Sequence, residues 1–213
     1  MHKYIITGPQ GCGKGTQAKM LKEDFDLDHI SVGDMFRWNI QNHTKLASQI
    51  NRIMAAGQLV PDSIAEEIVQ QRLEQHDWDF GFILDGFPRN KHQAEFYLER
   101  YDVDAVIRID VPDDVVTERI LARRLCESCG QDCNLLFNPP SRPDVCDTCG
   151  GKLVAREDDT PEAIQGRLND YHTQTEAGID LFREKAQMVV TDGTRTPEEI
   201  QRDIRAQLGL GEG

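Results

Sequence analysis

Residues 8–16 read GPQGCGKGT and directly follow a short apolar run. Glycines in such a turn let the backbone curl so that its N–H groups point inward at an anion. Lys14 can then reach the outer phosphates of a nucleotide, and the hydroxyl of Thr16 can bind Mg²⁺. In the common pattern Ser or Thr directly follows the Lys, whereas here Gly15 lies between them. A helix predicted for Lys14–Phe25 would add the positive end of its dipole. The stretch therefore predicts a phosphate-binding loop between a strand and a helix.

Short apolar runs alternate with amphipathic segments along the chain. The runs predicted as strands are Lys3–Thr7, His29–Ser31, Phe80–Leu84, Ala105–Ile109 and Gln187–Thr191. Helical periodicity lies between them, for example over Ile64–Leu73 and Val115–Leu125. Strands that alternate with helices favour an α/β fold, with a parallel sheet covered by helices on both faces.

The starts of three helices are marked by residues that commonly cap them. Ser31 precedes Asp34 by three positions, and Thr160 and Thr196 are each followed by proline and glutamate. The side-chain oxygens of such residues accept the N–H groups that the first turn of a helix leaves unpaired. Helices are therefore predicted to begin after these three residues.

Two segments interrupt the alternation of strands and helices. Residues 32–60 contain at least two helical stretches and no predicted strand. Residues 122–159 are rich in Cys, Gly, Pro, Asn and Asp and show almost no helical period. Both segments are predicted to be insertions on the sheet, so that residues 1–31, 61–121 and 160–213 would form the core.

The chain has 213 residues and a formal net charge of −13. This acidity argues against nucleic acid or an anionic membrane as a partner. No apolar run approaches the ~20 residues that a membrane helix needs. The N-terminal residues read as a strand rather than a secretion signal, so the protein is expected in the reducing cytoplasm.

Four of the six cysteines form two C-x-x-C pairs, Cys126 with Cys129 and Cys146 with Cys149. This spacing is typical of tetrahedral zinc sites, and four thiolates leave no open position, so the ion would be structural. The segment is too short to bury a sufficient core, and the metal would supply the missing folding free energy. Iron or cobalt could occupy the same ligand set, Cys133 could compete as a ligand, and two disulfides are the alternative.

Taken together, the motifs resemble the adenylate kinase family in its long form with a zinc-binding lid. The matching stretches are GPQGCGKGTQ (8–17), SVGDMFR (31–37), LVPD (59–62), LDGFPRNKHQ (84–93), RRLCESCG (123–130), FNPP (137–140), CDTCGGKLVAREDD (146–159) and DGT (192–194). They cover essentially the whole chain in collinear order. The resemblance implies a P-loop core with a five-stranded parallel sheet, a helical insert over 32–60 that binds the nucleoside monophosphate, and a lid over 122–159.

The resemblance also implies an activity, the reversible Mg²⁺-dependent transfer of the terminal phosphoryl group of ATP to AMP, giving two ADP. Such transfer depends on alignment and on neutralising charge, so cationic side chains are expected to carry it. A monomer without nucleic acid or membrane partners is expected. One alternative is a related kinase with another donor or acceptor base. A second is a P-loop switch or ATPase, but this sequence offers no recognisable group to position the attacking water. A third is a zinc-binding module for nucleic acid, which the negative net charge disfavours.

Individual residues receive roles from the same resemblance. Those that would carry the transfer are Lys14, Arg89, Arg123, Arg156 and Arg167, and arginine suits this because its planar fork makes paired contacts with phosphate. ATP would be bound by Gly11, Cys12, Gly13, Lys14, Gly15, Thr16, Arg123 and Arg195. AMP would be bound by Val32, Arg37, Gln58, Leu59, Val60, Gly86, Arg89, Gln93, Arg156 and Arg167. Thr16 and Asp85 would hold Mg²⁺, and Asp158 and Asp159 would link the lid to the core.

The chain departs from the family pattern near the expected base sites. Val32 stands where Thr is usual, and one lost hydrogen bond is worth about 0.5–1.5 kcal/mol, which predicts weaker AMP binding. Gln58 replaces a common Lys and Gln10 a common Pro. Cys133 and Asn134 stand where a Tyr-His pair is frequent, so the rings that would stack on the donor base are missing at these two positions.

Overall fold

The computed structural model describes residues 2–156 and 158–211. Its centre is a five-stranded sheet in the order β2-β3-β1-β4-β8, and each neighbouring pair is parallel. The strands are β1 (Lys3–Thr7), β2 (Leu27–Ser31), β3 (Gly81–Asp85), β4 (Ala105–Asp110) and β8 (Gln187–Asp192). The central strand β1 places Ile5 between Leu84 and Val106. The predicted α/β fold with a parallel sheet is therefore confirmed.

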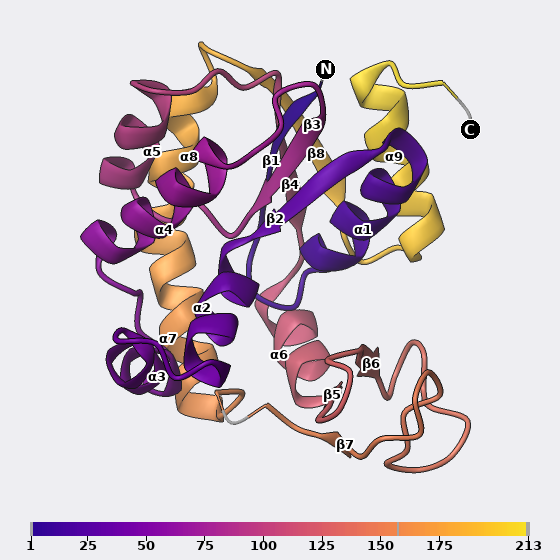
Figure 1. Cartoon of the computed structure of the whole chain (residues 1–213). Helices are drawn as coiled ribbons and strands as arrows, with labels where there is room; N and C mark the ends of the chain where they lie inside the picture. The colour runs from indigo at the N-terminus through magenta and orange to yellow at the C-terminus, as the bar shows by residue number, and fades with distance from the viewer. Residues whose placement is uncertain (1, 157, 212–213) are drawn as a thin grey trace.

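Successive residues of β1 point to opposite faces of the sheet, and a layer of helices covers each face (Figure 1). The face that carries Ile5 packs against α2 (Val32–Gln41), α4 (Asp62–Glu74), α5 (Lys91–Leu98), α8 (Glu176–Ile179) and the short helix η2 (Asp180–Phe182). The face that carries Tyr4 and Ile6 packs against α1 (Lys14–Phe25), α6 (Asp113–Leu121), α7 (Pro161–Asp170) and α9 (Pro197–Leu208). The π-helix η1 (Tyr171–Thr175) joins α7 to α8. No described helix has the length and the apolar composition needed to cross a membrane.

The three predicted helix starts are confirmed. The Ser31 side chain accepts the backbone N–H of Asp34, and Thr160 accepts that of Ala163. Thr196 forms a reciprocal capping box with Glu199 at the start of α9. These contacts satisfy N–H groups that the first turn leaves free.

The two irregular segments lie beyond the carboxyl ends of the strands, at the lower edge of Figure 1. Residues 32–60 hold α2 and α3 (Ala47–Ala55) and, all being described, no strand. The segment 122–159, hereafter the lid, contains a three-stranded antiparallel sheet in the order β6-β5-β7. Its strands are β5 (Arg123–Cys126), β6 (Asp132–Asn134) and β7 (Leu153–Val154). The functional division at these boundaries stays a prediction.

The helix predicted over Val115–Leu125 is wrong at its C-terminal end. Helix α6 ends at Leu121, and Arg123 already belongs to β5. Leu125 continues the helical apolar spacing in the sequence, but its backbone pairs with Asp132 and Val154. Strand partners distant in the sequence thus override the local period. Smaller shifts occur at strand ends, because β2 begins at Leu27 and β3 covers residues 81–85 rather than 80–84.

Candidate active site

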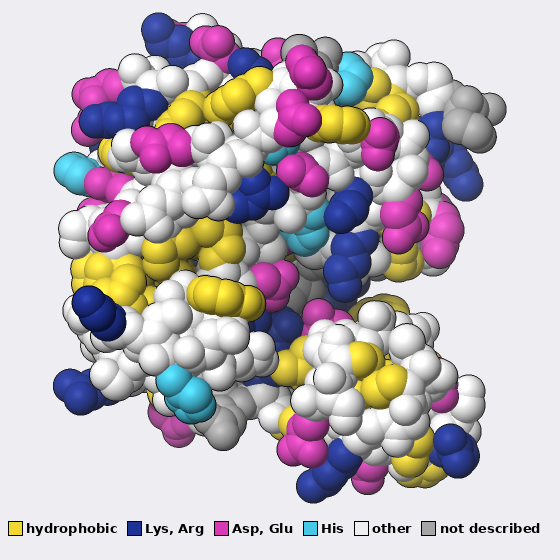
Figure 2. All heavy atoms as spheres, in the orientation of Figure 1, with side chains coloured by type: hydrophobic (Ala, Val, Ile, Leu, Met, Phe, Trp, Pro, Cys, Tyr) yellow, Lys and Arg dark blue, Asp and Glu magenta, His cyan; other side chains and the backbone are white. Residues whose placement is uncertain are grey.

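A cleft of about 580 Å³ lies where β1, β2 and β3 end, between the core, the segment 32–60 and the lid. In Figure 2 the lid forms a separate lobe, and a notch divides it from the core. The carboxyl ends of parallel strands are where open α/β sheets bind their ligands. The predicted site residues are therefore expected to lie in this cleft.

The glycine-rich loop between β1 and α1 forms one wall of the cleft. A Cβ on Gly8 would lie 2.6 Å from both Cys12 Sγ and the carbonyl oxygen of Ile109, so only glycine fits there. Gly13 caps α1 with a φ of 104°, a conformation that glycine adopts most readily. Lys14 Nζ donates to the carbonyl oxygens of Gly8 (2.7 Å) and Pro9 (2.8 Å) and thus lies across the loop.

Cationic side chains gather in this cleft. Among the described residues, its walls hold eight Lys and Arg against six Asp and Glu, whereas the whole chain has 24 against 37. The arginines are Arg37, Arg89, Arg119, Arg123, Arg156 and Arg167. Burial, and after it the charges of Arg123 and Arg37, lower the pKa of Arg156. Burial followed by the charge of Arg167 lowers that of Arg89, so the cleft suits a multiply charged anion.

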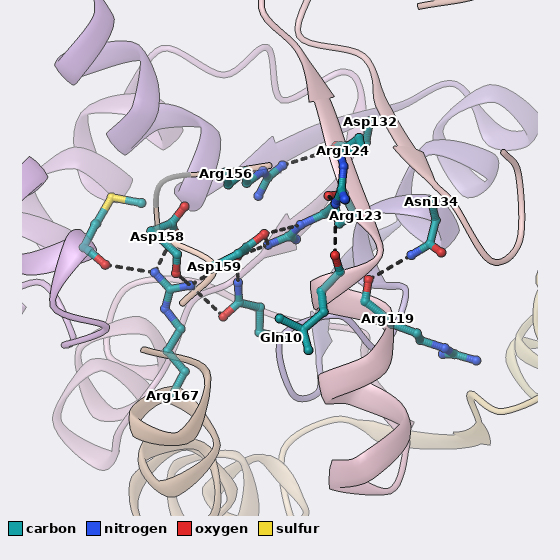
Figure 3. Close-up of polar contacts among 12 residues, drawn as sticks. Gln10, Arg119, Arg123, Arg124, Asp132, Asn134, Arg156, Asp158, Asp159 and Arg167 are labelled. Carbon is teal, nitrogen blue, oxygen red and sulfur yellow. Dashed lines mark hydrogen bonds and ion pairs between the residues drawn. The ribbon is translucent and has the colours of Figure 1, made fainter. Parts of the chain in front are cut away.

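Two carboxylates hold three parts of the cleft together (Figure 3). Asp159 accepts two guanidinium nitrogens of Arg123, with Nε–Oδ2 at 3.0 Å and Nη2–Oδ1 at 2.6 Å. Asp158 Oδ2 lies 2.6 Å from Arg167 Nη2. Gln10 of the loop joins the two pairs, because it donates to Asp159 Oδ1 (3.1 Å) and accepts from Arg167 Nη1 (2.8 Å). The lid, the loop and α7 are thereby connected, in agreement with the linking role expected for the two carboxylates.

Oxygen donors for a hard cation lie beside the loop. Asp85 is the last residue of β3, and its side chain is 12% exposed. Its Oδ2 lies 3.9 Å from the position of a Cβ on Gly15 and 3.2 Å from His29 Nε2. Thr16 lines the same cleft. A carboxylate and a hydroxyl next to a phosphate-binding loop fit the donor set that Mg²⁺ prefers.

The sulfur atoms of Cys126, Cys129, Cys146 and Cys149 all lie within 4.8 Å of one another in the lid. The backbone N–H of Cys129 donates to the Cys126 sulfur and lowers the pKa of that thiol to about 6. Four thiols so placed fit a closed tetrahedral metal site. Around it, the buried apolar cluster of the lid consists of only Cys126, Cys146 and Leu153 among the described residues.

Residues 6–187 match the family model described as adenylate kinase. This chain belongs to the adenylate kinase family. Proteins named adenylate kinase are 44% identical in Clostridium tetani (96% of this chain, 97% of the relative) and 42% identical in Clostridium perfringens strain SM101 (97% and 98%). One from Methanocella arvoryzae is 40% identical over 97% of this chain and 98% of its own length. The chain is therefore a phosphotransferase.

Most residues that the resemblance to adenylate kinases singles out come together in the cleft. Those that line it are Gly11, Gly13, Lys14, Gly15, Thr16, Arg37, Gln58, Leu59, Val60, Asp85, Gly86, Arg89, Arg123, Arg156 and Arg167. Their individual roles stay predictions.

Four of the residues predicted for ligand binding do not line the cleft. Cys12 is fully buried beneath the loop, and burial raises the pKa of its thiol. Val32 is 1% exposed and packs in the core. Gln93 is 2% exposed, and its side chain contacts Asp62. Arg195 follows β8 on the surface, where Nη2 lies 2.9 Å from Asp203 Oδ2.

Arg119 was missed in the sequence and lines the cleft beside the lid. It belongs to α6, its Nη1 donates to the carbonyl oxygen of Gly193 (2.8 Å), and its guanidinium lies 4.9 Å from the ring centroid of Phe137. The only signal for it in the sequence is its position four residues before Arg123.

Proposed function

We propose that the chain catalyses the reversible transfer of the terminal phosphoryl group of ATP to AMP, giving two ADP. The observation that carries the proposal is the convergence of six arginines and Lys14 on one cleft between the phosphate loop, the segment 32–60 and the lid. A transferring phosphoryl group spreads negative charge over its oxygens, so positioned cations are the main requirement. No nucleophile or general base is required of the protein.

The two nucleotides would occupy opposite ends of the cleft. The backbone of residues 11–16 and Lys14 would hold the β- and γ-phosphates of ATP. Arg37 and Arg89 would hold the α-phosphate of AMP, whose base would lie near Leu59, Val60 and Gly86 and would pair with the Gln93 amide. Arg195 would meet the donor base through its backbone, with Arg119 close to the same base.

Arginines from the lid and from α7 would act on the transferring group. Arg123 and Arg156 would approach it from the lid, and Arg167 from α7. Closure of the lid and of the segment 32–60 over bound nucleotides would exclude water and prevent wasted hydrolysis. Mg²⁺, held through Thr16 and Asp85 when bound, would neutralise phosphate charge.

We further propose that the four lid thiols hold a structural Zn²⁺. We also propose that the protein acts as a cytoplasmic monomer without nucleic acid or membrane partners.

An acceptor panel tests the proposal. ADP formation from Mg-ATP is measured with AMP, GMP, CMP, UMP or no acceptor. The proposal predicts rapid ADP formation with AMP and little without an acceptor. Preference for another monophosphate would keep the phosphate chemistry but reassign the base site around Val32, Gln58 and Gln93. Hydrolysis that does not depend on an acceptor would contradict the two-substrate reaction.

A further inference from the structure

Gln93, which the proposed function places at the acceptor base, has both ends of its side-chain amide fixed. Its Nε2 donates to Asp62 Oδ1 at 2.7 Å, and its Oε1 accepts the backbone N–H of Arg89 at 2.8 Å. A carboxylate only accepts and a backbone N–H only donates, so a single orientation of the amide satisfies both partners. Gln93 does not itself line the cleft, but it contacts Arg89, which does.

Asp62 is itself held in place as the first residue of α4. Its Oδ1 also accepts Asn90 Nδ2 at 2.7 Å, while the Asn90 side-chain oxygen accepts the backbone N–H of Gln93 at 2.9 Å. Asp62, Asn90 and Gln93 therefore form a closed set of hydrogen bonds at the start of two helices. With the carboxylate fixed in this way, the Gln93 amide has little freedom to turn over.

The orientation of an amide decides which purine edge it pairs with at a fixed position. At its 6-position adenine offers an amino donor beside a ring-nitrogen acceptor, whereas a 6-oxopurine offers an oxygen acceptor beside an N–H donor. A free glutamine pairs with either pattern by turning over about its last bond. In this structure the turned amide would bring its NH₂ against the Arg89 N–H and its oxygen against the Asp62 carboxylate. Both contacts are repulsive, and an unpaired buried polar group is unfavourable.

We propose that Asp62 is a positioning residue that sets acceptor specificity. By fixing the Gln93 amide, it favours a 6-aminopurine monophosphate over a 6-oxopurine monophosphate. The inference rests on the proposed function, because it takes Gln93 to contact the acceptor base. It would also supply base selectivity in a chain that has Val32 where the family usually has Thr.

Asp62→Asn tests the proposal, since asparagine keeps the shape and can donate to the oxygen of a turned Gln93 amide, which removes one of the two repulsive contacts. The measurement is kcat and KM with Mg-ATP and either AMP or IMP. IMP is the 6-oxopurine monophosphate that differs from AMP only at this edge of the base. We expect the AMP-to-IMP ratio of kcat/KM to fall about 10-fold, through a higher KM for AMP and with kcat for AMP within about 3-fold of the parent. Asp62→Ala, which leaves the Gln93 amide nitrogen without its acceptor, should lower the ratio as well.

Glu66→Gln is the matched control, because it removes a carboxylate one turn later on α4 that contacts His92 rather than Gln93. Its AMP-to-IMP ratio should equal that of the parent. If the parent transfers to AMP and neither Asp62 variant changes the ratio, the positioning role is overturned while the proposed function stands. A parent chain without AMP-dependent ADP formation would overturn the proposed function itself.

Discussion

Arg123 of the lid and Asp159 at its end form a bidentate ion pair with N···O distances of 2.6–3.0 Å. The Asp159 side chain is 3% exposed, and Arg167 Nη1 lies 3.8 Å from it. The carboxylate therefore pairs with guanidinium groups that are proposed to contact the phosphates. If Arg123 and Arg167 bind phosphate as proposed, nucleotide binding would exchange one anionic partner of these arginines for another and would couple the position of the lid to the presence of substrate.

Asp159→Asn should destabilise the protein without nucleotide and increase the stabilisation that ATP brings. Removing one member of a largely buried pair leaves the other charge uncompensated, and we expect a loss of about 2–3 kcal/mol. Thermal and urea unfolding with and without Mg-ATP measure both effects. Asp79→Asn, at an exposed position, is the control. An Asp159 variant as stable as the parent would show that the pair contributes nothing.

Metal removal should unfold the lid before the core. The apolar cluster of the lid is too small to hold β5, β6 and β7 together unaided. Elemental analysis is expected to find one zinc ion per chain. Iron or cobalt in its place would change the identity of the metal but not the proposed four-cysteine site. A chelator or Cys129→Ser should then expose residues 127–152 to protease while the parallel sheet survives. A chain that holds no metal and still resists protease there would contradict the site.

His172 should make stability depend on pH. Its Nε2 lies 3.0 Å from Asp113 Oδ1 of α6, and its Nδ1 lies 3.5 Å from Glu176 Oε2 of α8. The hydrogen bond to Asp113 raises the pKa of His172 above its usual 6.5, against the opposing effect of burial. The contribution of the charged His172 ring to the free energy of unfolding is therefore complete below the unfolded-state pKa. It is lost as the pH rises through the higher folded-state pKa.

Denaturation of the parent and of His172→Gln at pH 5.5 and pH 9 tests this sign. The parent should exceed the variant in stability by more at pH 5.5 than at pH 9. Both carboxylates are partly exposed, so the difference will be modest. An equal difference in stability between parent and variant at the two pH values would mean that the charged His172 ring does not stabilise the fold.

The parallel sheet could be predicted because its signals are local. Short apolar runs, glycine-rich turns and capping residues such as Thr196 each act within a few positions. The end of α6 could not, since the partners of Leu125 come from two distant strands. Tertiary pairing decides such boundaries, and the local apolar period does not reveal it.

The charged residues of the site divide in the same way. Lys14 and Arg89 could be located because they belong to recognisable motifs. Arg119 could not, because a single arginine in a polar helix usually lies on a solvated surface. The contacts of Gln10 span 149 and 157 residues, and only the folded chain brings these groups together.

The central claim is that the clustered arginines carry the transfer, and kcat of Arg89→Ala with saturating Mg-ATP and AMP tests it most directly. Alanine keeps the backbone bonds of residue 89 to Gln93 and Thr175, so the fold should persist in circular dichroism and thermal unfolding. Arg183→Ala, at an exposed ion pair, is the control and should match the parent. We predict that Arg89→Ala lowers kcat by about 100- to 1000-fold. A folded Arg89→Ala variant with kcat within twofold of the parent would contradict the account.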